Sequence, residues 1–178
     1  MSEPLVGVVM GSDSDLEVMR PAVDALEEFG LGAEVRVLSA HRTPDDALAW
    51  SRGAADRGLR VLIAGAGAAA HLPGVLAAVT SLPVIGVPIA ATPLNGMDAL
   101  LAIAQMPAGV PVASVAVDNG RNAGLLAVRI LAAGDARLRQ RYDRFREDLA
   151  AKVRAKDDRV REEFNHRRTS GTGGIGFR

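Results

Sequence analysis

A histidine and an arginine stand side by side in the stretch SAHRTP, which directly follows the apolar run AEVRVL. Thr43 and Pro44 are typical of a helix start, because threonine caps free backbone N–H groups and proline suits the first helical turn. Cap chemistry leaves Ser39, His41 and Arg42 unexplained. An arginine fork matches the geometry of a phosphate, and its charge favours a neutral imidazole that could act as a base. We therefore interpret this stretch as an active-site loop.

A second polar cluster is the stretch GSDSD, in which Ser12, Asp13, Ser14 and Asp15 follow a glycine turn. One helix cap needs only one such residue, so the others are in excess. Backbone N–H groups and hydroxyls at a helix start can hold a phosphate, and a carboxylate can accept hydrogen bonds from ribose hydroxyls. The stretch lacks the GxGxxG spacing of a dinucleotide site and the GK[ST] of a P-loop, so alone it is a weak signal.

The third stretch, AGAGAAAHLPG, is rich in small residues that let a ligand approach the backbone. Close packing of a helix on a sheet would explain the same residues, and in isolation it is the better interpretation. His71 could cap a helix, orient another side chain or take part in catalysis, and the sequence leaves these alternatives open.

Five apolar runs of strand length alternate with helical patterns along the chain. The predicted strands are 5–10, 34–38, 60–64, 83–87 and 112–117, and the predicted helices are 16–29, 44–57, 73–80, 97–105 and 123–133. The first three runs are mostly continuous in Val, Leu and Ile, as in strands covered on both faces. Alternating strands and helices imply a parallel sheet. We predict a flavodoxin-like, three-layer, doubly wound α/β fold and favour the strand order 2-1-3-4-5, which spacing alone does not fix.

This fold explains why the three stretches belong together. In doubly wound sheets ligands bind where strands end and helices begin. Each stretch follows a predicted strand, so we expect their side chains to meet at one edge of the sheet.

The length of 178 residues and the 48% of hydrophobic residues allow one domain with a sizeable core. We predict a domain over 1–134, a charged helical extension over 135–168 and a disordered, glycine-rich tail over 169–178. The extension carries a narrow apolar stripe that we expect to pack against its own domain or a neighbouring subunit; it consists of Leu138, Tyr142, Phe145, Leu149, Val153, Val160 and Phe164.

Composition excludes several classes of function. The chain has no cysteine, which rules out a disulfide framework, a thiolate metal site and a cysteine nucleophile.

Charge is unevenly distributed along the chain. Residues 1–134 hold 8 basic and 13 acidic residues, a charge of −5, and residues 135–178 hold 13 and 8, a charge of +5. The basic residues of the tail alternate with acids, so we expect a solvated helix face rather than a nucleic-acid site. No apolar run reaches membrane-spanning length, and we expect a cytoplasmic protein without membrane partners.

Together the motifs GSDSD, SAHRTP and AHLPG, followed by IGVPI, LNGMDALLAIAQMP and GVPV, resemble the class I N5-carboxyaminoimidazole ribonucleotide mutase family of purine biosynthesis. The resemblance covers roughly residues 5–150 in matching order. It implies a flavodoxin-like subunit of a homo-octamer whose C-terminal helix reaches neighbouring subunits. It also implies movement of a carboxylate from the exocyclic amine of a ribonucleotide carbamate to the imidazole ring carbon, without ATP, biotin, metal or any other cofactor.

The same resemblance implies roles for individual residues. His41 matches the catalytic histidine of the family, expected to act as a general acid and base while CO2 is released and recaptured. The remaining matches are expected to bind the substrate: Ser12, Ser14, Asp15, Ser39, Arg42, Gly67, His71 and Leu72.

The chain departs from the family pattern at a few places. Ala68 stands where the family usually has a second glycine, and Asp118 and Asn119 stand where relatives mostly have small residues. The extension beyond Lys152 is longer than usual.

Two alternatives to the mutase reaction stay open. One is the class II reaction, direct carboxylation of aminoimidazole ribonucleotide by free CO2, against which the AHLPG form of the loop argues. The other is a phosphoribosyl-binding module without catalysis; a receiver domain is disfavoured because the first lysine of the chain is Lys152.

Overall fold

The structure, a computed structural model, describes residues 3–170. Its centre is a parallel sheet with the order β2-β1-β3-β4-β5, which confirms the predicted fold and strand order. The strands are β1 (Pro4–Met10), β2 (Gly32–Val37), β3 (Val61–Gly67), β4 (Val84–Ile89) and β5 (Ala113–Ser114).

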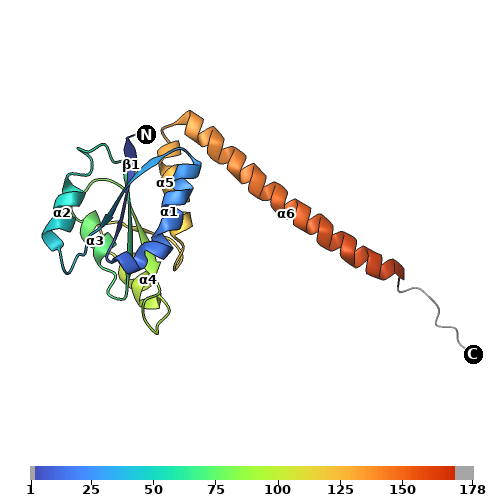
Figure 1. Cartoon of the computed structure of the whole chain (residues 1–178), viewed down its shortest axis with the longest axis horizontal. Helices are drawn as coiled ribbons and strands as arrows, with labels where there is room; N and C mark the ends of the chain where they lie inside the picture. The colour runs from blue at the N-terminus through green and yellow to red at the C-terminus, as the bar shows by residue number, and fades with distance from the viewer. Residues whose placement is uncertain (1–2, 171–178) are drawn as a thin grey trace, which may run out of the picture. The chain divides into compact units, whose positions relative to one another are not determined.

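Helices cover both faces of the sheet, giving three layers (Figure 1). They are α1 (Leu16–Glu28), α2 (Pro44–Arg52), α3 (Leu72–Ala77), α4 (Met97–Ala104) and α5 (Gly120–Ala132), preceded by a short 3-10 turn, η1 (Asp13–Asp15). Helices α1 and α5 pack together on one face, and side chains from α2, α3 and α4 share the core on the other face. Helices α2 to α5 each follow the carboxyl end of a strand, and α1 begins after η1, which follows β1.

The central strands are buried along almost their whole length, as their continuous apolar sequences predict. Two strand glycines make room for the largest side chains of the flanking helices. A Cβ on Gly7 would lie 2.7 Å from the ring of Trp50 in α2, and one on Gly65 would collide with Met19 of α1. Glycine at these points lets each helix lie close to the sheet.

Several predicted elements end earlier in the structure, and α3 ends at Ala77 rather than at residue 80. The second helix and the fifth strand differ most. The second helix ends at Arg52 rather than at residue 57, because the chain turns at Gly53 and then bends at Gly58, whose φ is +88°. The fifth strand is Ala113–Ser114 rather than 112–117. It lies at the edge of the sheet, where only these two residues pair with β4, so most of the predicted run is irregular.

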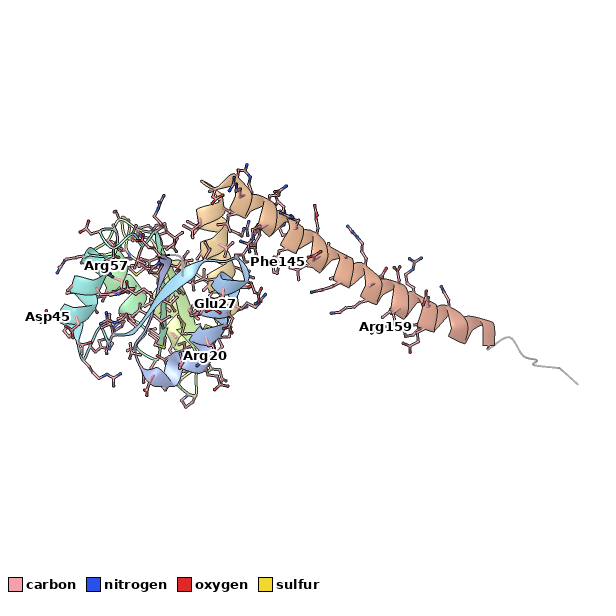
Figure 2. All side chains as sticks on the ribbon, turned by 45° about the horizontal axis from the view of Figure 1, so that its top comes forward. Arg20, Glu27, Asp45, Arg57, Phe145 and Arg159 are labelled. Atoms are coloured by element: carbon pink, nitrogen blue, oxygen red, sulfur yellow. The ribbon has the colours of Figure 1, made fainter. Side chains whose placement is uncertain are left out.

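The last helix, α6 (Ala136–Ser170), begins in the compact unit that ends at Arg139, and its remainder from Gln140 forms a second unit. Leu138 is buried within the first unit. In the second unit Leu149, Val153 and Val160 are exposed by 46%, 64% and 47%. Charged side chains such as Arg159 project from the helix along its length (Figure 2). Of the tail predicted over 169–178, the part from residue 171 lies outside the described residues.

No helix among the described residues is both long and apolar enough to span a membrane.

Candidate active site

A pocket of about 330 Å³ lies where β1, β2, β3 and β4 end. Its size falls within the range of pockets that bind small molecules. Three of the loops that line it are the stretches singled out in the sequence, and the fourth follows β4. The lining residues are Gly11, Ser12, Asp15, Ser39, Ala40, His41, Arg42, Ala66, Gly67, Ala69, Leu72 and Ala91.

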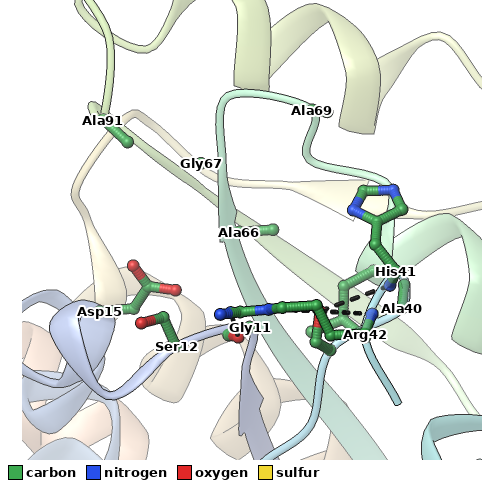
Figure 3. Close-up of a pocket in the computed structure, with 12 residues that line it drawn as sticks. Gly11, Ser12, Asp15, Ala40, His41, Arg42, Ala66, Gly67, Ala69 and Ala91 are labelled. Carbon is green, nitrogen blue, oxygen red and sulfur yellow. Dashed lines mark hydrogen bonds between the residues drawn. The ribbon is translucent and has the colours of Figure 1, made fainter. Parts of the chain in front are cut away.

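The loop after β2 is organised around the hydroxyl of Ser39. The Ser39 Oγ accepts hydrogen bonds from the backbone N–H groups of His41 (3.4 Å) and Arg42 (3.2 Å) and from the Arg42 Nε (3.4 Å). The Arg42 Nη2 donates to the carbonyl oxygen of Gly11 at 2.8 Å. Arg42 therefore lies along the pocket between the loops after β1 and β2, with its guanidinium toward Ser12 and Asp15 (Figure 3).

Thr43 occupies the N-cap position of α2, with Pro44 as the first helical residue, as predicted. The prediction that its side chain caps the helix is wrong, because no hydrogen bond joins the hydroxyl to the free N–H groups of α2. The hydroxyl turns back to Ser39 instead, accepting from the Ser39 N–H at 3.0 Å and donating to the Ser39 carbonyl at 3.3 Å.

The loop after β1 forms the opposite end of the pocket. The Ser12 Oγ caps the η1 turn by accepting from the Ser14 N–H at 3.4 Å and also accepts from the Ser14 hydroxyl at 2.9 Å. Burial raises the pKa of the Asp15 carboxyl, although hydrogen bonds from Ser12 and Ser14 and the charge of Arg42 oppose that effect. Ser12 and Asp15 line the pocket. Ser14 does not line it, but its hydroxyl is hydrogen-bonded to the side chains of Ser12 and Asp15.

The loop after β3 brings a second histidine next to His41, although His71 itself is not among the residues that line the pocket. The His71 Nδ1 lies 2.9 Å from the His41 Nε2, and the two rings meet edge to face at 84° with centroids 5.0 Å apart. At this distance one of the two nitrogens carries the hydrogen and the other accepts it. His71 precedes α3 but its side chain makes no cap hydrogen bond, so the structure favours a role beside His41 over a capping role.

The pocket wall between the two ends consists of small residues from β3 and the loops after it and after β4. Gly67 packs so closely on the loop after β4 that a Cβ there would lie 2.6 Å from the Cβ of Ala91. Figure 3 shows Ala66, Gly67 and Ala91 along this wall, with the His41 ring on the other side of the pocket. Ala68, the next residue along the loop from Gly67, does not line the pocket.

Sequence reasoning named none of the pocket alanines individually, and Ala91 lies outside the three stretches that it singled out. An alanine in an apolar loop offers no chemical signal, so only the three-dimensional arrangement identifies it. Among residues 3–165, whose side chains the structure describes, no three His, Asp or Glu side chains are grouped so that they could hold a metal ion.

A family model described as AIR carboxylase, where AIR is aminoimidazole ribonucleotide, matches residues 5–152 of the chain. The chain belongs to the AIR carboxylase family. It is 60% identical over 154 residues to the N5-carboxyaminoimidazole ribonucleotide mutase of Mycobacterium tuberculosis, covering 86% of this chain and 88% of the relative. It is also 53% identical over 160 residues to the mutase of Pyrococcus horikoshii, covering 90% of each chain.

A solved structure agrees with these sequence matches. The crystal structure of Treponema denticola PurE superimposes with a TM-score of 0.80 at 28% identity, covering 88% of this chain and 98% of that one. The family membership predicted from the motifs is therefore confirmed, and the match extends over the strands and loops that build the pocket.

Proposed function

We propose that this protein is an N5-carboxyaminoimidazole ribonucleotide mutase of purine biosynthesis. It moves the carboxylate of the carbamate from the exocyclic nitrogen to the neighbouring imidazole carbon. The observation that carries the proposal is a pocket lined by Ser12, Arg42 and His41, in a chain 60% identical to a mutase.

The proposed orientation of the substrate follows from the polar groups. Arg42 supplies a fork of N–H donors, and Ser12 and Ser39 supply hydroxyls, which together suit a phosphate. Asp15 accepts hydrogen bonds from ribose hydroxyls. The imidazole and the migrating carboxylate then lie between His41 and the wall formed by Gly67, Leu72 and their alanine neighbours. Small apolar residues there leave space for CO2 and exclude competing water.

The chemistry requires two proton transfers. When the carbamate C–N bond breaks, CO2 leaves and the nitrogen gains a proton; when the ring carbon attacks CO2, a C–C bond forms and that carbon must lose its proton. One histidine that first donates and then accepts a proton restores its own state at the end of the cycle. His41 is in the position to do this, with His71 at 2.9 Å to hold its ring. Retention of the released CO2 beside the ring carbon keeps its effective concentration high.

The alternative reaction is carboxylation of AIR by free CO2, which matches the description of the family model. Purified protein is incubated with N5-carboxyaminoimidazole ribonucleotide or with AIR plus bicarbonate, and formation of the C-carboxylated nucleotide is followed by absorbance. A mutase turns over the carbamate and gives little product from AIR at physiological bicarbonate. Preference for AIR would favour the carboxylase, and nucleotide binding without turnover of either substrate would indicate a binding module.

We also propose that residues 1–134 form the catalytic domain and that the helical extension packs against other subunits of a homo-octamer. The support is the exposed apolar surface of Leu149, Val153 and Val160, which costs free energy in water unless it is covered. The octamer itself is an expectation from the family resemblance.

The assembly is tested in the full-length chain with the double variant Leu149→Gln, Val153→Gln. It should sediment as smaller species than the unaltered protein. The control replaces two charged residues of the same helix, Arg154→Gln and Lys156→Gln, and should not change the assembly. Unchanged sedimentation of the Leu149 and Val153 variant would exclude this role for the helix.

A further inference from the structure

The hydroxyl of Thr43 is used for the active-site loop rather than for the helix that Thr43 begins. Its Oγ1 bonds both the N–H (3.0 Å) and the carbonyl (3.3 Å) of Ser39, and the Thr43 N–H donates to the same carbonyl at 2.9 Å. Three hydrogen bonds thus join Thr43 to the peptide groups of one residue. This closes the chain between residues 39 and 43 into a compact turn.

Ser39 passes this constraint on to the two residues that face the substrate. Its Oγ accepts from the backbone N–H groups of His41 and Arg42 and from the Arg42 side chain, at 3.2 to 3.4 Å. A hydroxyl oxygen has two acceptor lone pairs, so the three donors share them, and the geometry of all three contacts depends on where the Ser39 Oγ lies. The Ser39 backbone is fixed by Thr43, so the position of His41 and Arg42 depends on a side chain that does not line the pocket.

The use of Thr43 in the loop leaves the start of α2 without a side-chain cap. Two other features compensate for its absence. Pro44 at the first position has no N–H group to satisfy, and the Asp45 and Asp46 carboxylates lie in the first turn, where they interact favourably with the helix dipole. The helix therefore does not need the Thr43 hydroxyl, which remains available for Ser39.

We propose that Thr43 is a positioning residue for the reaction: through Ser39 it sets where His41 and Arg42 lie relative to the bound ribonucleotide. This inference rests on the proposed function. Small displacements of reacting groups reduce rates strongly, by roughly 100-fold for about 1 Å. The effect of losing the hydroxyl should therefore appear in catalysis and substrate binding more than in stability.

The test compares Thr43→Val, which keeps the branched shape but removes the hydroxyl, with Thr43→Ser, which keeps the hydroxyl. Thr80→Val is the matched control, because the Thr80 Oγ1 also accepts a backbone hydrogen bond, from Leu82 at 3.2 Å, before β4 and at the opposite end of the sheet. Steady-state kinetics with the carbamate and melting temperatures are measured for all three.

Thr43→Val should lower kcat/KM by roughly 10- to 100-fold, with kcat reduced and KM raised because His41 and Arg42 both move. Thr43→Ser should stay within about threefold of the unaltered protein, and Thr80→Val should keep full activity. The melting temperature of Thr43→Val should fall no further than that of Thr80→Val. The double variant Thr43→Val, Ser39→Ala should lose little more kcat/KM than Ser39→Ala alone. Both changes interrupt the same series of hydrogen bonds, which runs from Thr43 through Ser39 to His41 and Arg42.

Full activity of Thr43→Val, or equal loss in Thr43→Ser and Thr43→Val, would overturn the inference. If Thr43→Val does not fold, Thr43→Ala replaces it in the same comparison. An unaltered protein that does not convert the carbamate would count against the proposed function instead. Calorimetric binding of the C-carboxylated ribonucleotide then still tests Thr43: weaker binding to the valine but not the serine variant supports the inference, and equal binding refutes it.

Discussion

The loop after β2 and the loop after β3 both face the pocket, but different interactions hold them in place. Between residues 39 and 43 nearly every constraint is a hydrogen bond that involves a side chain. Between residues 67 and 71, apart from the contact of the His71 ring with His41, the constraints are close packing and short backbone hydrogen bonds. The Ala70 N–H donates to the Ala68 carbonyl and the His71 N–H to the Ala69 carbonyl, each at 2.8 Å. Specific polar side chains position the first loop, whereas small side chains let the second loop pack closely against its neighbours.

This difference has a consequence for how each loop tolerates change. In the polar loop the loss of one donor or acceptor should disturb a defined partner, and a residue that keeps the same atoms should restore function. In the small-residue loop an added methyl group should be harmful and a removed one tolerated, since the loop depends on volume and backbone conformation. The effect of a substitution should therefore depend on lost hydrogen bonds in the loop after β2 and on added volume in the loop after β3.

The largest effect is expected for His41→Asn in the polar loop. Asparagine keeps hydrogen-bonding capacity but cannot titrate, so the ribonucleotide should still bind while the rate falls by about 10⁴-fold, the upper range for general acid and base catalysis. Single-turnover kinetics and calorimetry separate the two effects. His71→Asn is the comparison, because it removes the partner at 2.9 Å but leaves His41, and it should lose less. Activity of His41→Asn within a few-fold would transfer the catalytic role to His71.

Arg42→Lys should have the next largest effect. Lysine keeps the positive charge but loses the fork and the hydrogen bonds of the guanidinium to Gly11 and Ser39. We expect KM to rise by roughly 10- to 100-fold, with a smaller change in kcat. Arg36→Lys in β2, the strand before this loop, is the control, since Arg36 does not line the pocket. Equal substrate affinity in Arg42→Lys and Arg36→Lys would remove Arg42 from the phosphate site.

Gly67→Ala tests the small-residue loop. The new Cβ would lie 2.6 Å from the Cβ of Ala91 and 3.0 Å from the carbonyl oxygen of Ile89, so the wall of the pocket must shift. We expect kcat/KM to fall by about tenfold, as reacting groups are displaced by less than 1 Å. The double variant Gly67→Ala, Ala91→Gly removes the closer contact and should recover most of the activity. Gly134→Ala, where the nearest atom would be 4.0 Å away, should have no effect.

The contrast between the loops also explains what could be predicted from the sequence. The parallel α/β fold was predicted from the alternating apolar runs, whereas the strand order was only favoured, because spacing alone does not fix it. The polar loops were found because Ser39, His41 and Arg42 exceed what a helix cap requires. The use of Thr43 could not be predicted, because a cap and a loop contact need the same residue type. Ala91 could not be predicted either, since its contribution is its closeness to Gly67, which depends on how two loops pack.

The smallest expected effect is at Ala68. The sign of its change in stability tests whether the loop after β3 depends on backbone conformation as well as on packing. Ala68 has a φ of +52°, a left-handed conformation that costs an L-residue about 1–2 kcal/mol, whereas glycine adopts it freely. Ala68→Gly removes that strain, but glycine loses about 0.5–1 kcal/mol more conformational entropy on folding. The net result should be a stabilisation of roughly 0.5 kcal/mol, a shift of a degree or two in melting temperature. Activity should persist, because Ala68 does not line the pocket. Ala69→Gly is the control one residue later, where φ is not positive, so the same change should destabilise. If both variants shift the melting temperature in the same direction, backbone strain at Ala68 does not affect the stability of this loop, and packing alone holds it in place.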